Sequence, residues 1–105
     1  MEIILRHRHF DEQHLENVKK IMSTKGAPKI RAIWSDIYGA WLAVEGCHRL
    51  RAAQELGLTP EIIDISNNKT ALIQDDGEDI KVKVLDLLED LTDNAPKSEI
   101  ISFED

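Results

Sequence analysis

Two amphipathic helical segments, separated by short apolar segments, restrict this chain to a fold that mixes helices with a sheet. Apolar residues recur at three- and four-residue spacing in residues 12–24, which predicts a helix with Asp11 as its N-cap. The same spacing in residues 47–56, followed by a glycine, predicts a second helix. A shorter helix is predicted over 85–91. We therefore expect an α/β (α+β) domain, with a small mixed sheet and helices packed on it.

Short apolar segments supply the strands of this sheet. Residues 29–44 alternate poorly and contain a Tyr-Gly turn, which predicts a hairpin whose first strand is covered on both faces. The sequence Asp75-Asp76-Gly77-Glu78 lies between two apolar segments and predicts a second hairpin. Further strands are expected at residues 3–5 and 61–65.

The length and composition fit one domain in a reducing compartment. We predict a single domain over residues 1–93, followed by an acidic, mobile tail over 94–105. No apolar run approaches the ~20 residues that a membrane span requires, so no membrane partner is expected. The first residues do not resemble a signal or transit peptide, and one cysteine cannot form an internal disulfide. A cytoplasmic location is therefore expected.

The net charge of −7 is divided unevenly along the chain. Residues 1–59 hold nine Lys and Arg against seven Asp and Glu, a balance of +2. Residues 60–105 hold four against thirteen, a balance of −9. The second half is either a solvated surface or a contact for a basic protein partner. The chain lacks the basic surface of a DNA-binding protein, so we expect no direct binding to DNA.

The most unusual stretch is Glu45-Gly46-Cys47-His48-Arg49, between a predicted strand and a predicted helix. Glycine there lets the chain turn tightly and lets a ligand approach the backbone. The first N–H groups of a helix have no internal partner and favour anions. Arg49 adds a guanidinium suited to phosphate, and His48 a second donor. The stretch therefore predicts a phosphate-binding loop, and the alternative is a helix start with solvated side chains.

The same stretch resembles the ParB/sulfiredoxin superfamily. Sulfiredoxins carry Phe-Gly-Gly-Cys-His-Arg at this place, and ParB-type domains and free-serine kinases of the same fold carry Asp-Gly-x-His-Arg. The segment "PKIRAIW" also resembles the strand that precedes the sulfiredoxin motif. The resemblance covers about residues 1–66, and the rest of the chain has no counterpart.

The resemblance implies that Gly46, Cys47, His48 and Arg49 bind the phosphates of a nucleotide such as ATP or CTP, with Mg²⁺. Glu45 matches the acid of the Asp-Gly-x-His-Arg group and is the candidate Mg²⁺ ligand or general base. Cys47 stands where sulfiredoxins keep their catalytic cysteine, and its position at a helix start favours the thiolate. The alternative for Cys47 is a small residue that fits under a phosphate.

Three functional interpretations follow. The first is a nucleotide-binding domain that transfers or hydrolyses a phosphoryl group, with Glu45, Cys47 and His48 as the catalytic candidates. The second is a sulfiredoxin-like reductase in which Cys47 attacks a phosphorylated sulfinate. The third is a non-enzymatic interaction or regulatory protein that uses its acidic C-terminal half.

Overall fold

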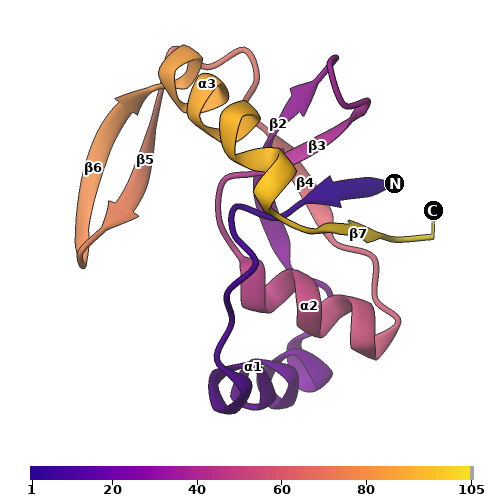
Figure 1. The fold of residues 1–105 in the computed structure, drawn as a ribbon. Helices are drawn as coiled ribbons and strands as arrows, with labels where there is room; N and C mark the ends of the chain where they lie inside the picture. The colour runs from indigo at the N-terminus through magenta and orange to yellow at the C-terminus, as the bar shows by residue number, and fades with distance from the viewer. Residues whose placement is uncertain (105) are drawn as a thin grey trace.

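A five-stranded mixed sheet forms the middle layer of the fold in the computed structural model, which describes residues 1–104 (Figure 1). The strand order is β4-β2-β3-β1-β7. Strands β1 and β3 pair in parallel, as do β2 and β4, and the other neighbours are antiparallel. This arrangement confirms the predicted small mixed sheet. The strand bounds are Glu2–Ile4 (β1), Lys29–Ser35 (β2), Ala40–Ala43 (β3), Glu61–Asp64 (β4) and Ile100–Ser102 (β7).

Helices α1 (Glu12–Lys25) and α2 (Cys47–Leu56) cover one face of the sheet (Figure 1). The carboxylate of Asp11 accepts a hydrogen bond from the His14 N–H at 2.7 Å, so the predicted N-cap is confirmed. Both helices begin within a residue of their predicted starts. Their apolar sides share one buried cluster with the sheet, which includes Ile3, Leu15, Met22, Ile30 and Leu50.

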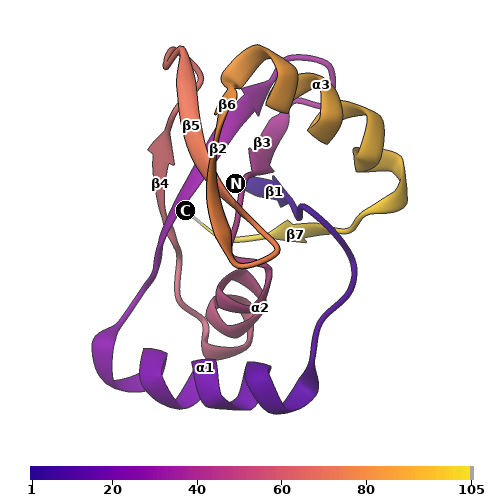
Figure 2. The same ribbon diagram turned by 90° about the vertical axis from the view of Figure 1, so that its left-hand side faces the viewer.

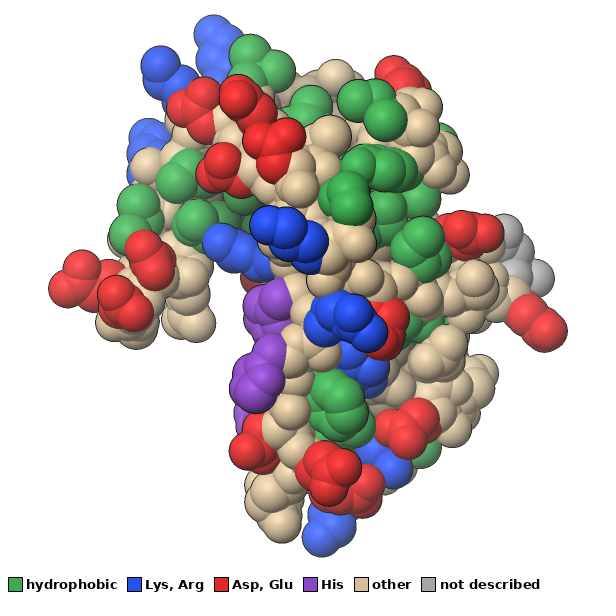
Figure 3. All heavy atoms as spheres, viewed as in Figure 1, with side chains coloured by type: hydrophobic (Ala, Val, Ile, Leu, Met, Phe, Trp, Pro, Cys, Tyr) green, Lys and Arg blue, Asp and Glu red, His purple; other side chains and the backbone are tan. Residues whose placement is uncertain are grey.

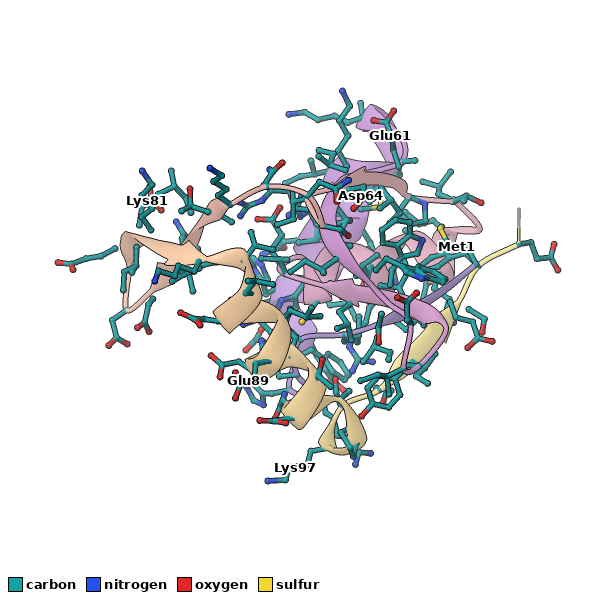
Figure 4. The ribbon with its side chains drawn as sticks, turned by 90° about the horizontal axis from the view of Figure 1, so that it is seen from above. Met1, Glu61, Asp64, Lys81, Glu89 and Lys97 are labelled. Carbon is teal, nitrogen blue, oxygen red and sulfur yellow. The ribbon has the colours of Figure 1, made fainter. Side chains whose placement is uncertain are left out.

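Helix α3 (Val84–Asn94) and the hairpin of β5 (Thr70–Asp75) and β6 (Glu78–Lys83) lie on the opposite face (Figure 2). A second buried cluster fills the space between them and the sheet. Strand β2 contributes Ile30 to the first cluster and Ile33 to the second, which confirms a strand covered on both faces. Viewed from above, the hairpin that carries Lys81 projects to the side opposite Met1 (Figure 4).

The C-terminal segment differs from the prediction. After a 3₁₀ turn over Ala95–Lys97, β7 pairs antiparallel with β1 and becomes an edge of the sheet. Ile101 and Phe103 are only 2% and 8% exposed. The expectation of a mobile tail over 94–105 is therefore wrong for the paired segment, because β1 supplies a partner strand and the first cluster supplies apolar contacts. The last position, 105, lies outside the described residues.

Within residues 1–104, no helix is long and apolar enough to cross a membrane.

We predict that Ile101→Ala lowers the free energy of unfolding by about 2–5 kcal/mol, because it leaves a cavity in the first cluster. Ile100→Ala is the matched control, since that side chain is on the same strand and is 54% exposed. Its effect should stay within about 0.5 kcal/mol. Urea denaturation of both variants measures the difference, and equal effects would show that β7 is not held by the core.

Candidate functional site

Helix α2 begins at a glycine that no other residue could replace without strain. Gly46 has φ +79°, a left-handed conformation, and a Cβ built there would lie 2.5 Å from Cδ1 of Ile30. Gly46 offers no side-chain cap, and the first helical bond runs from the Leu50 N–H to the Gly46 carbonyl at 2.8 Å. The first turn of α2 therefore begins without a capping side chain, which leaves its amides as possible donors to an anion.

The first residues of α2 line a cavity of about 910 Å³ that lies between α1, the start of α2 and the β5–β6 hairpin. In the space-filling view, histidine side chains lie at the hollow beneath the hairpin (Figure 3). The five residues of the predicted loop all line this cavity. The other residues that line it are Arg6, His7, His14, Val18, Arg31, Val44, Leu72, Ile73, Gln74 and Asp79.

Three arginines from different elements surround the cavity, and each is held by a protein acceptor. Arg6 donates to the Val44 carbonyl at 3.2 Å. Arg49, whose side chain is 41% exposed, donates to the Lys29 carbonyl at 3.0 Å. Arg31 pairs with Glu45, as described below. A guanidinium has five N–H donors, so each arginine keeps donors for a ligand after these contacts.

Glu45 and Arg31 form a bidentate ion pair. Nε of Arg31 donates to Oε2 at 3.0 Å, and a terminal nitrogen donates to Oε1 at 2.9 Å. The hydrogen bond from Arg31 holds the pKa of Glu45 below its ordinary value, although partial burial acts in the opposite direction. A lowered pKa makes Glu45 a weak general base, and both of its oxygens already accept hydrogen bonds from Arg31, which leaves them poorly placed to ligate Mg²⁺. The residues present therefore do not fit the predicted role of Glu45 in metal binding.

No group of three or more His, Cys, Asp or Glu side chains within residues 1–104 is arranged to hold a metal ion.

His48 also has a partner that the sequence did not indicate. Its Nε2 accepts a hydrogen bond from the Asp11 N–H at 2.9 Å, and its ring meets the His14 ring edge-on at 4.4 Å. Burial lowers the pKa of His48, and the neighbouring His14 adds to this effect. A neutral ring that accepts at Nε2 carries its proton on Nδ1. His48 therefore joins α2 to the start of α1, with one N–H left to donate to a ligand.

Cys47 lies at the wall of the cavity and contacts a histidine. Its Sγ is 3.8 Å from Nε2 of His7 and 3.8 Å from the His7 carbonyl oxygen, and the residue is 6% exposed. The sequence predicts Cys47 as a site residue, but it carries no signal that pairs this cysteine with His7. This pairing depends on the parallel neighbours β1 and β3, which bring the segments that follow them together.

Several site residues were missed by the sequence analysis. Arg31 could have been found, because a charged side chain in a strand predicted to be covered on both faces needs a buried partner. Arg6 and the hairpin residues carry no such signal, since they reach the cavity through the sheet order and the packing of the third layer.

A scan against protein-family models and searches of curated proteins and of solved structures gave no match for this chain. The resemblance to the ParB/sulfiredoxin superfamily therefore stays a prediction.

The Arg31–Glu45 pair predicts a specific dependence of stability on pH. Since the folded-state pKa of Glu45 lies below its ordinary value of 4.5, the pair should stabilise the fold above about pH 4.5 and lose this effect as pH falls through the folded-state pKa. Glu45→Gln should therefore be less stable than the wild type at neutral pH, and the difference should shrink at acid pH.

Urea denaturation across a pH series measures this difference. Glu89→Gln is the matched control, because Glu89 is exposed and forms no ion pair with any residue in the range 1–104. A difference between wild type and Glu45→Gln that does not change with pH would show that the ion pair does not stabilise the fold.

Proposed function

We propose that this chain binds a nucleoside triphosphate through its phosphate groups at the first turn of α2. The observation that carries the proposal is the convergence of Arg6, Arg31 and Arg49 on the uncapped start of that helix. Both features favour anions, and they act on the same volume. Guanidinium groups and helix-start amides together form charge-assisted hydrogen bonds with phosphate oxygens.

The size and the charge of the cavity support a nucleotide rather than a single phosphate ion. Pockets for small molecules have volumes of roughly 300–1,000 Å³, and this cavity, at about 910 Å³, is near the upper end. Its lining includes three arginines against two carboxylates, Glu45 and Asp79, so that its balance is positive in a chain whose net charge is −7. A positive cavity in an acidic protein is best explained by an anionic ligand.

The proposed chemistry is phosphoryl transfer or hydrolysis, in which the protein mainly positions the phosphates and stabilises their charge. The arginines and the amides of α2 are suited to that task. Because Glu45 is engaged by Arg31, no step is assigned to Glu45 as a base or to a metal that it would hold. His48 remains as an orienting donor through Nδ1, and its contact with Asp11 fixes the ring.

We predict that Arg49→Ala weakens nucleotide binding by about 10- to 100-fold, the equivalent of a lost charge-assisted contact of about 1.5–3 kcal/mol. The free energy of unfolding should change little, because the side chain is 41% exposed and its contacts are a hydrogen bond to the Lys29 carbonyl and a partly exposed ion pair with Glu45 at 3.8 Å. Isothermal titration calorimetry with ATP, GTP, CTP and UTP, with and without Mg²⁺, measures the affinity, and urea denaturation measures the stability.

Arg8→Ala is the control for the loss of one positive charge, since the Arg8 side chain is exposed and does not line the cavity. It should leave affinity nearly unchanged. If both variants bind nucleotide equally well, or if the wild type binds none, the proposed function is wrong.

A second candidate function is favoured by the contact of Cys47 with His7. A cysteine next to a histidine, at the wall of a phosphate-binding cavity, has the arrangement of an activated nucleophile. In the reductase interpretation, the Cys47 thiolate attacks the sulfur of a phosphorylated sulfinate, a sulfur–sulfur bond forms and phosphate leaves, with His7 taking the thiol proton. A thiol then reduces the resulting bond.

If this second function is correct, Cys47→Ser should end the ATP-dependent reduction of a peptide that carries cysteine sulfinic acid, in the presence of Mg²⁺ and a thiol. The affinity for ATP should stay within a few-fold of the wild type, because the substitution keeps the helix-start amide. Mass spectrometry of the peptide measures the reduction. Turnover that survives in Cys47→Ser would exclude the thiol as the nucleophile.

A further inference from the structure

Within residues 1–104, the β5–β6 hairpin leaves one edge of β5 without a partner strand, and this edge faces the proposed nucleotide site. Among these residues, β5 pairs only with β6, within the two-stranded sheet. Three consecutive residues of β5, Leu72, Ile73 and Gln74, line the cavity. Consecutive residues of a strand point to opposite faces, and Asp79 of β6 also lines the cavity, so the cavity meets β5 at its edge and on the face that carries Leu72 and Gln74.

The register of the hairpin shows which backbone groups lie at that edge. The Val84 N–H donates to the Lys69 carbonyl at 3.0 Å, which makes that pair a hydrogen-bonded one. Hydrogen-bonded pairs alternate with non-hydrogen-bonded pairs in an antiparallel ladder. The pairs Leu72–Lys81 and Gln74–Asp79 are therefore non-hydrogen-bonded. The N–H and C=O groups of Leu72 and Gln74 consequently point away from β6, toward the cavity.

The side chain of Leu72 adds an apolar surface beside these polar groups. The Leu72 side chain is 53% exposed. The rest of the cavity is lined largely by charged and polar residues, so Leu72 supplies an apolar contact there. The other face of the hairpin is partly buried, since Ala71, Ile73 and Val82 pack on the second cluster. Leu72 is thus available to a ligand without any rearrangement of the fold.

We propose that the free edge of β5 binds the base of the nucleotide, an inference that rests on the proposed function. The backbone donors and acceptors of Leu72 and Gln74 hydrogen-bond to the edge of the base, and the Leu72 side chain packs on its face. A nucleobase has this combination, a flat apolar face with a polar edge, whereas a phosphate does not.

The distribution of charge in the cavity fixes the direction of the ligand. Asp79 is opposite Gln74 in the hairpin and places a carboxylate at that side of the cavity. The charge of Asp79 contributes to the raised pKa of Arg31, after the larger effect of Glu45. Phosphates are repelled by Asp79 and attracted by Arg49 and the start of α2, so the neutral base is the part of the nucleotide that meets β5.

The test compares nucleotides with inorganic tripolyphosphate, which has the phosphates but no base. The wild type should bind at least one of ATP, GTP, CTP and UTP more tightly than tripolyphosphate in calorimetry. Leu72→Ala should weaken binding of that nucleotide about tenfold, because it removes an apolar contact with the base. Its affinity for tripolyphosphate should stay within about twofold of the wild type, which also shows that the phosphate site is folded.

Ile80→Ala is the matched control, because Ile80 is an exposed apolar residue of the same hairpin that does not line the cavity. It should change neither affinity. A wild type that binds all nucleotides and tripolyphosphate equally, or a Leu72→Ala variant that loses both affinities or neither, would overturn the base subsite and leave the proposed phosphate site standing. A wild type that binds neither ligand would overturn both proposals.

Discussion

The bidentate ion pair between Arg31 and Glu45 determines both the shape and the charge of the cavity. It joins the middle of β2 to the residue before the N-cap Gly46, and so fixes the turn from which α2 begins. An isolated arginine at this depth would carry an uncompensated charge, and an isolated carboxylate would repel phosphate. The pair compensates both charges. Glu45 also lies 3.8 Å from a terminal nitrogen of Arg49, so its carboxylate is shared between two guanidinium groups of the cavity.

Local patterns predicted the helices and hairpins well, because each has a signal within a few residues. The N-cap at Asp11, the glycine after α2 and the Asp-Gly turn of the second hairpin all lie where the sequence indicated. The sequence also predicted a tight turn at Gly46, and the residue adopts a left-handed conformation there. These features depend on backbone conformation and on capping, which neighbouring residues determine.

Features that depend on distant segments were not predictable in the same way. Strand β7 is too short to be recognised alone, and its place follows from pairing with β1 about a hundred residues earlier in the chain. The partners of Glu45 and His48 follow from the register of β2 with β3 and from the position of α1 against α2. The sequence predicted a site at residues 45–49, which line the cavity, but it did not indicate the Arg31 partner of Glu45 or the Asp11 partner of His48. These contacts limit the roles that Glu45 and His48 can take.

The cavity is arranged so that little order must be created when a ligand binds. Immobilising a long, flexible side chain at a binding site costs roughly 0.5–1.5 kcal/mol, and the cost is avoided when the chain is already held. Arg6 is held by the Val44 carbonyl and Arg31 by Glu45, and Arg49 is held by both the Lys29 carbonyl and Glu45. Because a guanidinium has donors on three nitrogens, one contact can hold it while others stay free. A lysine at these positions would have one nitrogen to contact both the protein acceptor and the ligand. Arginine at all three positions therefore favours a site whose side chains are held in place before the ligand binds.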